Sequence, residues 1–231
     1  MPSKRYQKAL GLVDPSKTYP LTQAVEVLGK FPKAKFSETV DLAFRLGVDP
    51  KQSDQMVRGT CPLPHGSGKQ VRVLVFTKPG AQAEAARAAG AEHVGFDEFI
   101  KKCQEGWADF DVAVATTEAM SEVRKLGKVL GPRGLMPNPK TGTVTDDVAK
   151  AVKEVKAGRV EFKIDKAGNV HVPVGKATFS PLQIAENARG VIEAVLKARP
   201  SGAKGVFVRS CTLSLTMSPP VRLDLKEFGA N

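Results

Sequence analysis

The sequence predicts an α/β protein of two domains, a split α+β domain built from both chain ends and an inserted, Rossmann-like βαβ domain. Between residues 70 and 157, short apolar runs alternate with segments of helical spacing, which is typical of βαβ units around a small parallel sheet. Outside that block, polar and apolar residues alternate with period two, as in half-buried antiparallel strands. Positive charge is also divided unevenly between the two parts.

The N-terminal part contains one clear strand, residues 38–48, with the sequence ETVDLAFRLGV. One face of this strand holds Val40, Leu42, Phe44 and Leu46. Since side chains of a strand point alternately to its two faces, this apolar face is expected to lie against a core. We expect the strand in an antiparallel sheet of the terminal domain, which takes in residues 1–67 and 158–231.

The inserted domain, residues 68–157, is predicted from its order of elements. Short apolar runs at 71–76 and 111–116 fit strands of a parallel sheet that is covered on both faces. Helical spacing is found in the stretches 81–91, 96–106, 117–130 and 145–158. Asp146 and Asp147 stand at the start of the last helix, where an N-cap explains them better than a metal site. The crossings between the domains are expected near 67–70 and 157–159.

The chain then returns to the terminal domain. Residues 159–175 look like a hairpin that turns at 167–169. Ser180 and Pro181 form a helix start, an N-cap followed by proline in the first helical position. The buried stripe of that helix is expected to consist of Ile184, Ala188, Ile192 and Val195. A long last strand is expected over residues 205–217. The side chains expected on one face of it are Val206, Val208, Ser210, Thr212, Ser214 and Thr216.

Charge favours an anionic partner for the terminal domain. The 231 residues include 35 Lys and Arg against 24 Asp and Glu, a net charge of +11. Residues 68–157 hold 14 of the basic and 12 of the acidic residues, a net charge of +2 that leaves +9 for the terminal domain. If the partner is a phosphate backbone, the main contact is expected in the terminal domain, because each neutralised phosphate releases a counterion.

The sequence gives little support to metal, disulfide or membrane chemistry. The cysteines, at positions 61, 103 and 211, are odd in number and form no CxxC pair, so we expect a reduced, cytoplasmic protein without disulfides or zinc. The three histidines are scattered, at positions 65, 93 and 171. No cofactor is expected. No stretch has the length of a signal-peptide core or a membrane span, so no membrane partner is expected either.

The most distinctive segment is 127–144, GKVLGPRGLMPNPKTGTV. Proline fixes the backbone angle φ, and glycine adopts backbone angles that other residues avoid, so a rigid, irregular loop is expected. Lys128, Arg133 and Lys140 project from it and suit a polyanion. The segment does not fit a phosphate loop, which needs GxxxxGK[ST].

Together with three further segments, this loop resembles one family. The others are 33–51 (KAKFSETVDLAFRLGVDPK), 162–179 (FKIDKAGNVHVPVGKATF) and 210–217 (SCTLSLTM). Over essentially the whole chain, and in the same order, the sequence resembles the family of the first protein of the large ribosomal subunit, L-one, of bacterial type. The resemblance implies the split two-domain layout and no enzymatic activity. It also implies a monomer within the ribosome, whose terminal domain binds the rRNA of the mobile stalk beside the tRNA exit site.

Further partners and residues follow from the resemblance alone. It implies help in releasing deacylated exit-site tRNA and, for bacterial members, repression of the protein's own operon mRNA. The RNA-binding positions it implies are Glu26, Lys35, Phe36, Lys163, Asp165, Ser210, Thr216, Met217 and Ser218. Thr212 and His171 join them as neighbours on the expected RNA face. Secondary contacts are expected from Lys4, Arg5, Arg133 and Lys140.

Physical roles can be assigned to several of these residues. Lys35 and Lys163 would neutralise phosphates, and Phe36 would stack on a base or sugar unless it is a core residue. The two acids would accept hydrogen bonds from 2′-hydroxyl or guanine amino groups, or else pair with nearby lysines. Lys163 stands where the family usually has arginine, which puts a bidentate contact in doubt. Ser218 replaces a usual glycine, which would alter close approach of the backbone to RNA.

Two functions of other classes remain open from the sequence. An RNA-processing or nucleotide-using enzyme would place its ligand at the strand ends of the inserted domain, but the turn at 77–80 is too short for a phosphate loop. A generic DNA-binding protein would carry a basic recognition helix, whereas the helices here have mixed charge. The hydroxyl-rich last strand suits RNA recognition, but from the residues alone a plain solvent-exposed strand face is favoured, because Ser and Thr are common there.

Overall fold

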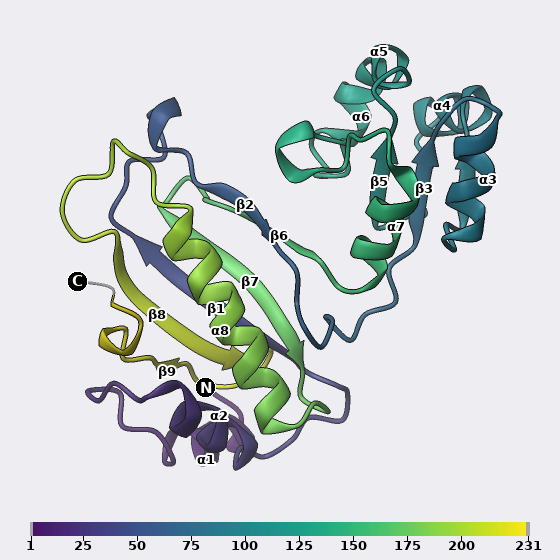
Figure 1. Cartoon of the computed structure of the whole chain (residues 1–231). Coiled ribbons are helices and arrows are strands. Elements are labelled where there is room, and N and C mark those ends of the chain that lie inside the picture. Colours follow the sequence, from purple (N-terminus) through teal and green to yellow (C-terminus); the bar gives the residue numbers. More distant parts are fainter. Residues whose placement is uncertain (1, 230–231) are drawn as a thin grey trace. The chain divides into compact units, whose positions relative to one another are not determined.

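The computed structural model describes residues 2–229, apart from the side chain of Lys140, and divides into two compact units (Figure 1). The terminal unit extends to Gly68 and resumes at Val160, and the inserted unit spans Lys69–Arg159. Each unit has its own buried apolar clusters. The mixed α/β fold class is confirmed. That the two units are independent domains stays a prediction.

A four-stranded antiparallel sheet with the order β7-β1-β8-β9 forms the terminal unit (Figure 1). Its strands are β1 (Thr39–Leu46), β7 (Asn169–Lys176), β8 (Val208–Leu215) and β9 (Val221–Arg222). The alternation predicted for β1 is confirmed, because its four apolar side chains are at most 2% exposed. Period-two burial therefore gives the sheet one core face and one face turned to solvent.

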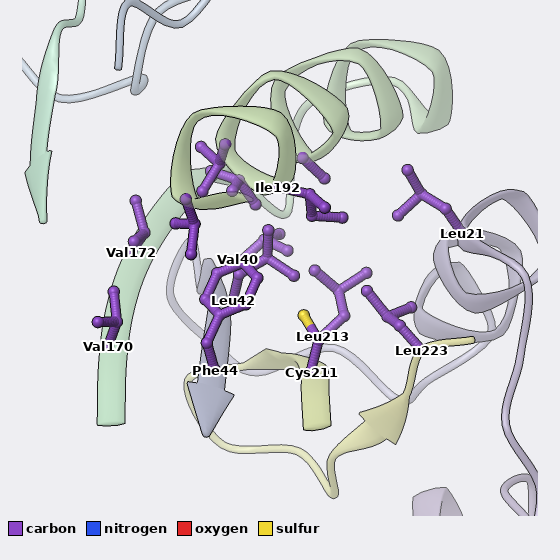
Figure 2. Close-up of a cluster of buried hydrophobic side chains, with 14 of the residues drawn as sticks. Leu21, Val40, Leu42, Phe44, Val170, Val172, Ile192, Cys211, Leu213 and Leu223 are labelled. Atoms are coloured by element: carbon purple, nitrogen blue, oxygen red, sulfur yellow. The ribbon is translucent and has the colours of Figure 1, made fainter. Parts of the chain in front are cut away.

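Helices cover only the core face of this sheet. They are α2 (Leu21–Gly29) and α8 (Pro181–Lys197), while α1 (Lys4–Leu10) precedes them in the chain. Figure 2 shows Ile192 of α8 and Leu21 of α2 above Leu42 and Leu213 of the strands. The predicted start of α8 is confirmed, since Ser180 and Gln183 form a reciprocal capping box. Short 3-10 turns lie at Ser53–Gln55 (η1) and Lys226–Phe228 (η4).

The hairpin predicted over 159–175 is wrong in its pairing. The chain does turn there, and the Asp165 N–H donates to the Asn169 carbonyl at 2.8 Å. However, β6 (Val160–Lys163) pairs with β2 (Arg58–Cys61) in a separate two-stranded sheet, whereas β7 pairs with β1. The Ile164 N–H continues the β6 ladder to the Val57 carbonyl. Alternation and a turn predict two strands but do not say which strand each one pairs with.

The face predicted for the last strand is wrong at Val208. The register between β1 and β8 shifts after Arg45, which leaves Arg209 as the extra residue of a β-bulge. Because the bulge changes the phase, Val208 lies in the core at 4% exposure, while Ser210, Thr212 and Ser214 follow the solvent face. Val206 precedes the strand and is 53% exposed.

The inserted unit contains a parallel sheet of order β4-β3-β5 (Figure 1). Its strands are β3 (Val73–Phe76), β4 (His93–Gly95) and β5 (Val112–Ala115). Its longer helices are α3 (Ala81–Ala88), α4 (Asp97–Gln104) and α7 (Val148–Lys156). The stretch of helical spacing at 117–130 forms three successive short helical elements, the α-helices α5 (Met120–Val123) and α6 (Gly127–Leu130) with the 3-10 turn η2 (Arg124–Leu126) between them. A further turn, η3, covers Pro139–Thr141.

Two acids fix the local structure of the inserted unit. Asp147 is the N-cap of α7, accepting the Lys150 N–H at 3.1 Å, so the capping interpretation is confirmed. Asp111, beside β5, accepts hydrogen bonds from the Lys69 ammonium and from the Arg72 N–H at 3.1 Å. The Lys69 hydrogen bond, followed by that of Arg72, lowers the pKa of Asp111 to about 2. Asp111 is therefore ionised at neutral pH and holds Arg72, the residue before β3, in place.

Candidate nucleic-acid interface

The solvent face of the terminal sheet brings together residues from three strands. We call this surface the open face; it consists of Asp41, Ala43 and Arg45 of β1, Asn169, His171 and Pro173 of β7, and Ser210, Thr212 and Ser214 of β8. In the register, Ala43 lies between His171 and Thr212, and Arg45 lies between Asn169 and Ser210. The structure thus places His171, Ser210 and Thr212 close to one another, as the sequence predicted.

At one end of the open face, β8 runs into residues 216–218, which we call the Met217 turn. The Met217 side chain is 55% exposed, and the Phe36 side chain is 53% exposed. Phe36 is therefore not a core residue. Single exposed apolar side chains are normal on soluble proteins. Phe36 and Met217 are distinctive because one buried carboxylate accepts hydrogen bonds from backbone N–H groups close to both of them.

That carboxylate belongs to Glu38, which is 2% exposed. Its Oε2 accepts the Ala34 N–H at 3.2 Å, and its Oε1 accepts the Met217 N–H at 3.2 Å. The Arg5 guanidinium donates to the same Oε1 at 3.4 Å and to the Met217 carbonyl at 3.3 Å. Both polar groups of the Met217 backbone are therefore hydrogen-bonded to side chains of the protein, the N–H to Glu38 and the carbonyl to Arg5. A buried charge satisfied by several donors is a fixed structural point.

Glu38 was not among the candidate residues predicted from the sequence. A signal for its burial is present, because residue 38 has the same period-two phase as Val40 and Leu42. Arg5, predicted as a secondary RNA contact, is half-buried and takes part in this network. Lys4 is exposed on α1.

Hydroxyl groups of the Met217 turn bond to the protein itself. The Thr216 Oγ1 accepts the Thr39 N–H at 3.0 Å. The Ser218 Oγ accepts the Leu215 N–H at 2.9 Å and donates to the Pro219 carbonyl at 3.0 Å. The Ser218 side chain is thus turned toward its own turn. These bonds make the turn rigid and leave the Met217 side chain as its outward group.

Ser218→Gly is expected to lower the free energy of unfolding by about 1 kcal/mol, because the Leu215 N–H loses its partner and glycine adds freedom to the unfolded chain. RNA affinity is expected to stay within about two-fold, because the lost hydroxyl faces inward. A ten-fold change in affinity would need a change of about 1.4 kcal/mol in the free energy of binding. Thermal unfolding and RNA titration of the same preparations measure the two effects. A ten-fold gain in affinity would instead mean that the serine side chain obstructs the RNA.

The two acids predicted at the RNA surface differ in their surroundings. Asp165 accepts the N–H groups of Asn169 at 2.7 Å and Ala167 at 2.8 Å, and these bonds, chiefly that of Asn169, lower its pKa. The Asn169 side-chain amide also donates to it at 3.3 Å, so its partners are groups of the turn rather than lysines. Glu26 is exposed on α2 and has no hydrogen bond or ion pair within residues 2–229. Lys35 and Lys163 are exposed as well.

A third acid, Asp41, lies on the open face and was not predicted. It is half-buried between Pro173 and Ser214 in the register. Burial raises the pKa of its carboxyl, while the charges of His171 and Lys176 act in the opposite direction. An acceptor with this little solvation suits hydroxyl and amino donors of a ligand better than phosphates.

The remaining predicted residues lie in the inserted unit. Arg133 is exposed, and its guanidinium donates to the Gly106 carbonyl at 3.4 Å. The side chain of Lys140 lies outside the described part of the structure. Among the described residues there is no group of three His, Cys, Asp or Glu side chains placed to hold a metal ion. Nor do these residues include a helix long and apolar enough to cross a membrane.

The arrangement can bind a polyanion that also carries hydroxyl groups and flat rings. Exposed Arg45 lies opposite Ser210 of β8, and the exposed apolar side chains of Phe36 and Met217 stand at the other end of that strand. Comparison with known proteins is consistent with such a ligand. Residues 28–219 match the model of the family described as "Ribosomal protein L1p/L10e family". The matched range includes all candidate residues except Lys4, Arg5 and Glu26.

Proposed function

Because this chain belongs to the ribosomal protein L1p/L10e family, whose members are structural proteins of the ribosome that bind rRNA, we propose that it binds the rRNA of the mobile stalk. The RNA would lie on the open face and the Met217 turn of the terminal unit. Family membership also places the protein on the ribosome in the cytoplasm and in a class of structural proteins rather than enzymes.

The observation that carries this proposal is the exposure of Phe36 and Met217 beside backbone that the buried Glu38 carboxylate holds. Backbone that is held before binding loses little freedom on binding, so more of the contact energy of the side chains it carries appears as affinity. Stacking of a base on an exposed aromatic side chain contributes about 1–3 kcal/mol. Phe36 is suited to stack, and the thioether of Met217 is suited to fill an irregular gap beside a ribose.

The open face suits the rest of an RNA surface. Ser210 and Thr212 offer hydroxyls to phosphate, 2′-hydroxyl and base edges, and Asp41 offers an acceptor. Lys35 and Lys163 neutralise phosphates at its margins. We further propose that this protein is a bacterial-type member that acts as a monomer in the ribosome, assists release of exit-site tRNA and represses its own operon mRNA. An mRNA that mimics the stalk would use the same surface.

Phe36→Ala combined with Met217→Ala is expected to weaken binding of a stalk rRNA fragment by about 30- to 1,000-fold, given about 1–3 kcal/mol for stacking on Phe36 and about 1 kcal/mol for the Met217 contact. Unfolding should be nearly unchanged, because both side chains are more than half exposed. Titration of labelled RNA at one fixed salt concentration measures the affinity, and thermal unfolding measures the stability.

The matched control is Leu12→Ala with Leu182→Ala, which removes two exposed apolar side chains elsewhere on the terminal unit, 48% and 68% exposed. It should bind RNA like the wild type. Equal affinity of the wild type for duplex DNA and stalk RNA at the same salt would contradict the proposal. So would a Phe36/Met217 variant that binds within two-fold of wild type.

A further inference from the structure

A pocket of about 800 Å³ lies in the terminal unit at the end of the open face opposite to the Met217 turn. The connection after β1 forms one wall, from Gly47 to Gln55. The turn after β6 and the loop before β8 form the others, with Ala167 and Gly202. We call it the basic pocket because Arg45, Lys166, Lys204 and Arg209 line it.

The four cations of the basic pocket come from separate segments and lack acidic partners. None of them forms an ion pair within residues 2–229. Arg45 donates only to the Asn169 side-chain oxygen, at 3.3 Å. Asp49 and Asp54 also line the pocket, so its four cations face two carboxylates, and the Asp49 carboxylate accepts the Lys51 N–H at 3.0 Å. The lining keeps a positive surplus that a bound anion would offset.

Close backbone packing builds the pocket walls. A Cβ at position 47 would lie within 3.0 Å of the Val206 carbonyl oxygen, so the β1 connection meets the loop before β8 without room for a side chain. A Cβ at Gly202 would lie 2.9 Å from the Asp54 carboxylate. The bulge adds to this shape, since Arg209 and Ser210 are both exposed, although they are neighbours in one strand. Arg209 can therefore line the pocket while Ser210 stays on the open face.

We propose that the basic pocket binds backbone phosphates of the same RNA that contacts the Met217 turn. This rests on the proposed function and adds a second contact region to it. Arg45 belongs both to the open face and to the pocket lining, so the two surfaces are continuous. The strand from Thr39, beside the Met217 turn, to Arg45 covers about 20 Å at 3.3–3.4 Å per residue. An RNA that contacts both ends must therefore run along the strands over several nucleotides.

Charge removal tests the pocket. The variant Lys166→Gln/Lys204→Gln/Arg209→Gln is expected to weaken stalk-RNA binding about 10- to 100-fold near 0.1 M salt. The slope of log affinity against log salt concentration should become less steep by about 2–3, because each phosphate contact contributes close to one to that slope. The matched control, Lys101→Gln/Lys150→Gln/Lys153→Gln, removes three exposed charges of the inserted unit that form no ion pair among the described residues. It should change the slope by less than one.

The outcomes separate this inference from the proposed function. If both triple variants lose affinity and slope equally, only overall charge matters and the pocket proposal is overturned. An unchanged pocket variant overturns it too, while the Phe36/Met217 variant still reports on the function. If the wild type does not prefer stalk RNA, the proposed function fails whatever the slopes are.

A position-specific probe gives a second readout. The cysteines of the chain, Cys61, Cys103 and Cys211, are all buried, so a single introduced surface cysteine can be labelled selectively. Ala167→Cys, carrying an iron chelate that cleaves nearby RNA, is expected to cut the stalk RNA at a discrete set of nucleotides. Leu182→Cys on α8, which packs on the core face of the sheet, serves as control and should cut weakly. Equal cutting from both positions, or none from Ala167→Cys, overturns the proposal.

Discussion

Glu38→Ala is expected to lower the free energy of unfolding by about 3–5 kcal/mol, the usual cost of breaking a buried ion pair by removing one partner. The substitution leaves the N–H groups of Ala34 and Met217 without their acceptor and the Arg5 guanidinium without its charge partner. Because the same bonds fix the Met217 backbone, RNA affinity should also fall, by at least ten-fold under conditions in which the variant is still folded.

Glu38→Gln separates positioning from stability. The amide keeps the size of the side chain and one oxygen acceptor but loses the charge, so we expect a loss of about 1–2 kcal/mol in unfolding free energy. If Glu38 acts on RNA through Met217, the loss of affinity from Glu38→Gln should almost disappear in a Met217→Ala background. A double-mutant cycle on RNA affinity measures this coupling. Additive losses would show that Glu38 contributes to binding by another route.

Gly47→Ala is expected to destabilise the terminal unit by about 2–3 kcal/mol, in the range of overpacking in a dense interior. The added methyl would meet the Val206 carbonyl oxygen, which is backbone and cannot rotate away. The Gly47 N–H also donates to the Phe207 carbonyl at 2.7 Å, so the two segments cannot separate without losing that bond.

The matched control for Gly47→Ala is Gly29→Ala at the last residue of α2, where a Cβ would meet nothing within 4 Å. It should be neutral or stabilising by up to about 1 kcal/mol, because alanine favours helix. The aromatic residues allow each unit to be followed separately. Trp107 is the single tryptophan and lies in the inserted unit, whereas Tyr6 and Tyr19 lie in the terminal unit. A Gly47→Ala variant whose tyrosine-detected unfolding matches that of Gly29→Ala would contradict the expected clash.

Elements with strong local signals were predictable from the sequence. The alternation of β1, the Ser180–Pro181 start of α8 and the Asp147 cap of α7 each depend on residues within one turn or strand. The short strand β4 was missed, because three residues are too few to show a period. Apolar spacing over 117–130 predicted helix, but it does not distinguish one helix from successive short helical elements.

What could not be predicted depends on contacts between distant segments. The bulge at Arg209 is visible only in the register with β1, and the pairing of β6 with β2 joins segments about 100 positions apart. The role of Glu38 likewise appears only when residues 5, 34 and 217 meet around it. Local sequence patterns indicated which residues face solvent, but not which of them the fold holds rigid.

The alternation of buried and exposed side chains in the terminal sheet affects which substitutions the protein can accept. Along β8, Cys211, Leu213 and Leu215 belong to the core, while the residues between them belong to the open face. Substitutions of the second set leave the packing of the first set intact, because beyond the bulge at Arg209 the side chains of β8 point alternately to the two faces. Specificity for a new RNA can therefore be selected at Ser210, Thr212 and His171 without lowering the thermal stability on which folding in the cell depends.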